Sequence, residues 1–153
     1  MIGSDIKFYG SGANNLGNGI ASEITSGATN NLFHDVVLTR TEYRCFFVKN
    51  MHSTDSALNV RVWIDSNTPS PSTQIEIALG DGDKDDHYES PIAAETVAPA
   101  ITDTFAAPAD EASAKTLGSL TPGQSKPMWI KRTVTSGSAA SSDPVTIKVK
   151  ADQ

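Results

Sequence analysis

The chain has 153 residues, the size of one domain, and such a length can bury a sizeable core without a metal or disulfide scaffold. Hydrophobic residues make up 38% and charged residues 20%, one residue is cysteine, and the net charge is −6. No stretch approaches the roughly 18–20 apolar residues of a membrane span, and the first ten residues lack the pattern of a signal peptide. These features argue against a membrane protein, a collagen, a coiled coil and a disulfide-stapled secreted module.

The charges are unevenly distributed along the chain. Residues 81–111 contain nine acidic residues and one basic residue, whereas residues 112–153 contain six basic and two acidic residues. The acidic middle argues against nucleic acid as a partner, because phosphate binding needs clustered Lys and Arg. The basic last segment fits the solvated face of a sheet, or a surface that docks on an acidic protein neighbour.

The N-terminal part is rich in turn-forming residues. Residues 10–19 are mostly Gly and Asn, which accept positive φ angles. Only Ile6–Tyr9 reads as a short strand. We therefore expect residues 1–31 to form an extended arm outside the core, with Phe8 and Tyr9 as candidate partner-binding residues that become ordered on a neighbour.

The first strong strand signals follow the arm. Residues 43–49 are aromatic and β-branched, and residues 57–65 alternate between aliphatic and polar or aromatic side chains. The polar linker between them has the length of a hairpin loop, so the two strands are expected to be antiparallel neighbours. Residues 74–79 alternate again.

The acidic segment has weak periodicity, and the strand pattern returns after it. Residues 80–114 suggest only short edge strands, near 93–97 and 101–105. Residues 120–124 predict a type II turn with Pro122 and Gly123 at its centre. A strand over 128–134 places Arg132 on its apolar face, near the open end, and residues 145–150 alternate as the closing strand.

Strands separated by polar turns, with no convincing helix, predict an all-β fold. We expect an antiparallel β-sandwich, Ig-like or jelly-roll-like, over residues 32–153, with the extended N-terminal arm before it. A closed barrel is the second choice.

One acidic stretch invites a metal interpretation. Asp81, Asp83 and Asp85 supply oxygens at the spacing that opens a calcium loop. The match then fails, because Asp86 stands where the loop needs Gly and Ile92 where it needs Glu. The acidic run is therefore a weak candidate for calcium and is better explained as a solvated loop, so we expect no metal and no cofactor.

Other chemically notable residues have structural explanations. His34, His52 and His87 lack zinc-ligand spacing and are expected in turns or on the surface. Cys45 lies in an apolar run and is expected to pack as a small hydrophobe. Trp63 and Trp129 lie opposite the aliphatic stripes of their strands. Each covers an apolar patch beneath the acidic segment or the arm, or belongs to a subunit interface.

Several segments are similar to one class of small virion proteins of tailed bacteriophages and prophages. The similarity covers most of the chain, at residues 8–19, 31–35, 41–50, 62–65 and 122–134. The class resembles capsid decoration (cement) proteins. The resemblance implies a protein on the outer surface of the phage head that binds the major capsid protein and bridges its subunits. It implies a structural rather than catalytic role, with no nucleic-acid or membrane partner, and lattice symmetry favours a homo-oligomer, either a trimer or a dimer.

Other functions remain open from the residues alone. Within a virion the chain could be a tail, neck or baseplate component. From another class, it could be a carbohydrate- or calcium-binding β-sandwich adhesion module. A small β-fold hydrolase is the enzyme alternative, and no nucleophile motif such as Gly-x-Ser-x-Gly supports it.

Overall fold

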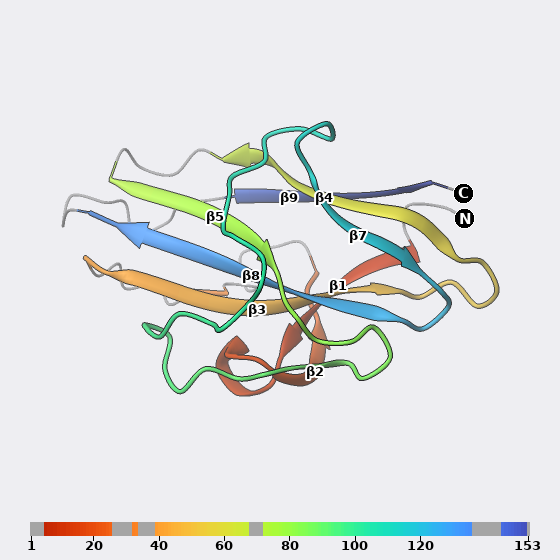
Figure 1. Cartoon of the computed structure of the whole chain (residues 1–153), viewed down its shortest axis with the longest axis horizontal. Coiled ribbons are helices and arrows are strands. Elements are labelled where there is room, and N and C mark those ends of the chain that lie inside the picture. Colours follow the sequence, from red (N-terminus) through yellow and green to blue (C-terminus); the bar gives the residue numbers. More distant parts are fainter. Residues whose placement is uncertain (1–4, 26–31, 34–38, 68–71, 136–144, 153) are drawn as a thin grey trace.

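Two antiparallel sheets make up the computed structural model of the chain (Figure 1). It describes residues 5–25, 32–33, 39–67, 72–135 and 145–152. One sheet has the strand order β5-β8-β3-β1-β2-β6, and the other has the order β7-β4-β9. The elements are β1 (Ile6–Ser11), a 3-10 turn (Ala13–Asn15), β2 (Asn18–Glu23), β3 (Thr41–Asn50), β4 (Ala57–Asn67), β5 (Thr73–Leu79), β6 (Tyr88–Glu89), β7 (Lys115–Leu120), β8 (Ser125–Val134) and β9 (Val145–Asp152).

The main core lies between the two sheets. It is built from the aliphatic stripes that the sequence predicts, because every second side chain of a strand points to the same face. Val60, Val62 and Ile64 of β4 meet Phe46 and Met128 of the larger sheet in one buried cluster. The predicted all-β antiparallel fold, consistent with a β-sandwich, is confirmed.

A second apolar cluster covers the opposite face of the larger sheet. Cys45 and Phe47 of β3 and Trp129 of β8 are buried there with Ile92. The chain after β5 runs across this part of the sheet in Figure 1. Strand β3 is therefore buried on both faces, which explains its nearly continuous run of apolar residues.

The described part of residues 1–31 is not an arm, which corrects the expectation from sequence. Strand β1 lies inside the larger sheet, where Ile6–Gly10 pairs with residues 46–50 of β3, and Ile6 belongs to the main core. The Gly- and Asn-rich residues form the turn between β1 and β2, and Asn14 and Asn15 adopt φ angles of 63° and 56°. Residues 1–4 and 26–31 of the expected arm lie outside the described residues.

The predicted hairpin of the two early strands is also wrong. Strand β3 pairs with β8 and β1, whereas β4 pairs with β7 and β9 in the other sheet. The chain crosses between layers after Asn50, whose buried side-chain amide donates to the carbonyl oxygens of Asp55 and Leu120, both at 2.9 Å. These bonds hold the crossing at a fixed place.

The turn before β8 follows the sequence prediction. Gly123 has a φ of 84°, and Gln124 N donates to Thr121 O at 3.0 Å, as a type II turn with Pro122 in the preceding position requires.

Among the described residues, no helix has the length and apolar character needed to cross a membrane.

Candidate functional site

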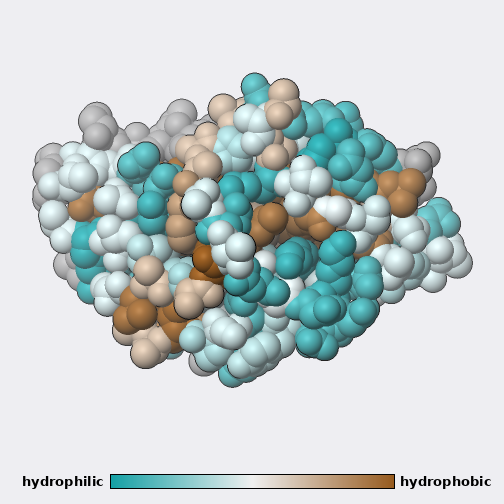
Figure 2. Space-filling view, in the orientation of Figure 1, coloured by the Kyte–Doolittle hydropathy of each residue, from teal (hydrophilic) through white to brown (hydrophobic). Residues whose placement is uncertain are grey.

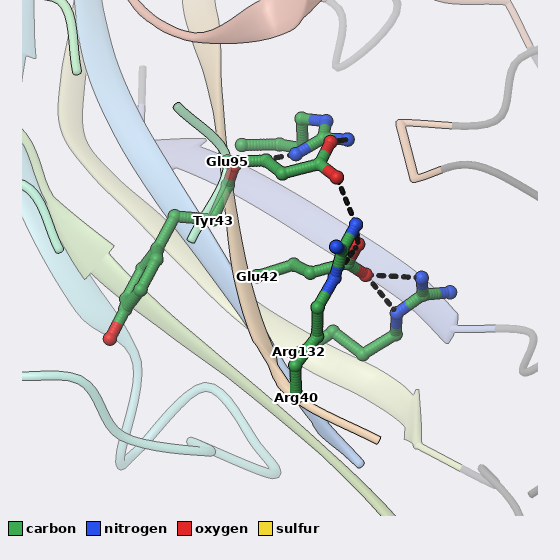
Figure 3. Close-up of polar contacts among 6 residues, drawn as sticks. Arg40, Glu42, Tyr43, Glu95 and Arg132 are labelled. Carbon is green, nitrogen blue, oxygen red and sulfur yellow. Dashed lines mark hydrogen bonds and ion pairs between the residues drawn. The ribbon is translucent and has the colours of Figure 1, made fainter. Parts of the chain in front are cut away.

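A group of charged side chains, three of them buried, lies at one end of β3 and β8 (Figure 3). The charged cluster consists of Arg40, Glu42, Arg44, Glu95 and Arg132. Glu42 and Arg132 face each other in the β3–β8 register, and the carboxylate of Glu42 accepts hydrogen bonds from Nε and a terminal nitrogen of Arg132. Arg40 donates to the other oxygen of Glu42 through Nε at 3.0 Å and Nη2 at 2.7 Å.

Glu95 joins a distant loop to this cluster. Its carboxylate accepts hydrogen bonds from Nη2 of Arg40 and, at 2.5 Å, from Nη2 of Arg44. Its backbone oxygen accepts a bond from Tyr43 N at 2.7 Å, so residue 95 pairs with the edge of β3 beyond the end of β1. The ring of Phe33 lies 4.6 Å from the guanidinium of Arg132 and 5.4 Å from that of Arg44. Both distances suit cation–π attraction.

Burial and hydrogen bonding act in opposite directions on Glu42. Burial raises the pKa of its carboxyl most strongly, but the bonds and charges of Arg132 and Arg40 together bring the pKa below its ordinary value of 4.5. The ionised form is therefore the one that the fold stabilises. The cluster acts as a structural tie between β3, β8 and the loop that carries Glu95.

We expect this tie to weaken in acid. A carboxyl whose pKa is lowered by folding contributes stability above its unfolded pKa, and the contribution disappears as the pH falls through the folded pKa. The free energy of unfolding should therefore decrease below about pH 4.5, and part of that slope should be absent in a Glu42→Gln variant. Denaturant unfolding at several pH values measures both slopes. Identical slopes for the two proteins would contradict the assignment.

The loop held by Glu95 displays small apolar side chains. This apolar loop, residues 91–101, has Val97 46% exposed. Its other exposed apolar residues are Pro91, Ala93, Ala94, Ala98 and Ala100. Ile92 is buried in the second core cluster and Ile101 packs against it, so both ends of the loop are fixed. Figure 2 shows apolar side chains gathered at the lower left, where this loop runs in Figure 1.

The chain matches no family model, no curated protein and no solved structure. What the site can do must therefore follow from its own contacts. The charged cluster has its carboxylates bound to guanidinium groups, an arrangement that fixes backbone segments to one another. The apolar loop is the surface that the cluster positions.

The candidate calcium loop directs its carboxylates to different protein groups. Asp81 accepts hydrogen bonds from the backbone and hydroxyl of Thr102, Asp83 from Asp85 N, and Asp85 from the side-chain amide of Gln124. Within the described ranges, no three His, Cys, Asp or Glu side chains gather as metal ligands would. These contacts describe a hydrogen-bonded surface loop.

The tryptophans are less exposed than an interface requires. Trp129 is fully buried in the second core cluster, and its ring nitrogen donates to Glu89 at 3.3 Å. The interface interpretation is therefore wrong for Trp129, because the acidic segment covers the face that the strand pattern left open. Trp63 lies on β4 and exposes 9% of its surface, which leaves little area for a partner.

Phe8 and Tyr9 belong to β1 and have partners within the chain. The ring of Phe8 packs edge-on against Phe46 at 5.9 Å between centroids. The hydroxyl of Tyr9 donates to the sulfur of Met51, and the ammonium of Lys49 lies 5.6 Å from its ring centroid. Neither side chain lies on a free arm, because β1 pairs with β3. The expectation that Phe8 and Tyr9 belong to an arm that becomes ordered on a neighbour is therefore wrong.

Two histidines occupy structural positions. His52 Nδ1 accepts bonds from the backbone of Thr54 and Asp55, and His87 Nδ1 lies 2.7 Å from the hydroxyl of Ser125. Ser125 is completely buried. These contacts fit the expected turn and surface roles, and His34 lies outside the described residues.

Cys45 is a buried free thiol, as predicted. Burial raises its pKa to about 12, so the thiolate that reacts with alkylating agents is absent near neutral pH. We expect iodoacetamide to leave Cys45 unmodified in the folded protein and to modify it fully in denaturant, as measured by intact mass. Rapid labelling of the folded protein would contradict this burial.

The sequence contained a partial signal for the charged cluster. Glu42 and Arg44 share a strand face with Phe46, and Arg132 shares one with Ile130, so charged residues stand in two apolar stripes. The sequence predicted Arg132 near the open end of its strand. It did not predict that Arg132 is buried or that its partner is Glu42. The apolar loop had no periodic signal, and the short strand expected near 93–97 is irregular chain.

Proposed function

We propose that the chain is a structural protein of a tailed-phage particle, namely a capsid decoration protein on the outer surface of the head. In this role it binds the major capsid protein and stabilises contacts between neighbouring capsid subunits. It assembles as a homo-oligomer, a trimer or a dimer, as closed symmetry at lattice positions favours. Many copies on one lattice turn modest single contacts into strong attachment.

One observation carries the proposal. The segments that resemble virion proteins include residues 41–50, 62–65 and 122–134, and these fall on β3, β4 and β8. The three strands hold central places in the two sheets, since β3 and β8 pair over nine residues and β4 lies between β7 and β9. The segments that resemble virion proteins therefore lie on central strands of both sheets.

The surface supports an adhesive role. In the charged cluster, guanidinium groups of the same chain bind the carboxylates. The fixed apolar loop offers hydrophobic area to a neighbour. A decoration protein needs a rigid domain with such surfaces.

Co-sedimentation with purified heads tests the proposal. We expect the protein to sediment with full heads in a constant ratio to capsid protein, and to leave them when a competing copy is added. Sedimentation with isolated tails instead would assign it to a tail, neck or baseplate. A thermal shift with glycans and no association with particles would favour an adhesion module.

A further inference from the structure

We infer that Met51 is a site of oxidation to methionine sulfoxide by peroxides, and that the hydroxyl group of Tyr9 directs the incoming oxygen to one side of its sulfur. The inference goes beyond the proposed function and does not depend on it. Its support comes from the exposure of Met51 and from the contact that its sulfur makes with Tyr9.

Exposure distinguishes Met51 from the other methionine in the described ranges. Met51 is 46% exposed, whereas Met128 is completely buried in the main core. Met1 lies outside the described residues. A peroxide reaches an exposed sulfur directly, but it reaches a buried sulfur only when the fold opens locally or globally. The surface also tolerates the product better than the core does, because a sulfoxide is polar and disrupts apolar packing.

The sulfur of Met51 has a partner on one side. The hydroxyl of Tyr9 donates a hydrogen bond to Met51 Sδ at 3.4 Å. A thioether is a weak acceptor, but both residues are held in place. Met51 N donates to Asp5 O at 2.8 Å, and Tyr9 lies in β1, which pairs with β3. The ammonium of Lys49 lies 5.6 Å from the centroid of the Tyr9 ring, at a distance that suits cation–π attraction. The hydroxyl therefore stays beside the sulfur.

The reaction makes the sulfur a chiral centre. A sulfur lone pair attacks one oxygen of hydrogen peroxide, the O–O bond breaks, and a proton passes to the departing hydroxide. The products are the sulfoxide and water, so the methionine is oxidised and the peroxide is reduced. Oxygen can add to either of the two lone pairs of a thioether, and each addition gives a different sulfoxide epimer. Because the Tyr9 hydroxyl occupies one lone pair, addition to the other lone pair is favoured.

Limited treatment of the folded protein with hydrogen peroxide tests both parts of the inference. Peptide mapping by mass spectrometry measures the rate of oxidation at each methionine. We expect Met51 to be oxidised at least about tenfold faster than Met128. The oxidised Met51 peptide is then divided between two reductases, each of which restores only one sulfoxide epimer. We expect one epimer to exceed the other by about two- to fivefold, a ratio that one hydrogen bond of modest net strength can give.

Two controls isolate the role of the hydroxyl. Tyr9→Phe keeps the aromatic ring and removes the donor, so Met51 should still be oxidised but with nearly equal amounts of the two epimers. Thermal unfolding verifies that this variant is folded. The original protein treated in denaturant is the second control. There Met51 and Met128 should react at similar rates, and the epimers of Met51 should again be nearly equal, because the contact with Tyr9 is lost.

Each outcome bears on the inference. Unequal epimers in the folded protein that become equal in Tyr9→Phe and in denaturant support it. Equal epimers in the folded protein, or a ratio that Tyr9→Phe leaves unchanged, overturn the directing role of the hydroxyl. Oxidation of Met128 as fast as that of Met51 in the folded protein overturns the assignment of the site. These measurements use the isolated protein without phage heads, so their failure is distinct from a failure of the proposed function.

Discussion

Replacing Glu42 with glutamine is expected to lower the free energy of unfolding by about 3–5 kcal/mol. Glu42 is fully buried and accepts hydrogen bonds from both Arg132 and Arg40. The glutamine keeps an acceptor oxygen but removes the negative charge, so two guanidinium groups lose their shared counter-charge, and breaking a buried pair is costly for this reason. Urea unfolding followed by fluorescence measures the loss.

An exposed ion pair supplies the matched control. Lys7 Nζ lies 3.9 Å from Glu23, and both side chains are 40% exposed. Glu23→Gln should therefore cost less than about 1 kcal/mol. In the Glu42→Gln background, Arg132→Met should recover part of the lost stability, because it removes a charge that has no partner. Equal losses in the free energy of unfolding for Glu42→Gln and Glu23→Gln would contradict this expectation, because the cluster would then stabilise the fold no more than an exposed ion pair does.

Trp129→Ala should destabilise the protein by about 3–5 kcal/mol. The side chain is fully buried among Cys45, Phe47 and Ile92, so truncation leaves a cavity in the second core cluster. It also removes the ring nitrogen that donates to the buried carboxylate of Glu89. Thermal and urea unfolding of the monomer measure the effect.

The neighbouring aromatic residue in β6 is a suitable control. Tyr88 is 44% exposed, and Tyr88→Ala should change stability by less than about 0.5 kcal/mol. A Trp129→Ala protein with normal stability and impaired assembly would return Trp129 to an interface and contradict its buried place.

Local patterns predicted the strands better than their partners. The alternation of residues 57–65 correctly gave Val60, Val62 and Ile64 as the inward face of β4, and Pro122 with Gly123 gave the turn before β8. The same alternation placed Leu58 inward, but Leu58 is 42% exposed, because the strand register shifts between Leu58 and Arg61. Sheet neighbours depend on contacts between distant residues. Residues 6–10 pair with residues 46–50, and nothing in the turn chemistry of the first segment indicates that partner. Turn chemistry alone therefore predicts an arm.

The candidate site depended even more on long-range register. Glu42 meets Arg132 only because β3 and β8 pair in one register across 90 positions of sequence. The strand pattern placed Arg132 on an apolar face but could not supply its partner. The apolar loop has no strand or helix period, so its fixed shape comes from Glu95, from the buried Ile92 and from the partly buried Ile101.

Electron microscopy of the intact particle tests the central claim most directly. We expect density for a two-sheet domain on the outer face of the head, repeated over the lattice. Density that fits this domain only in the tail or neck, or a particle with no such density, would contradict it.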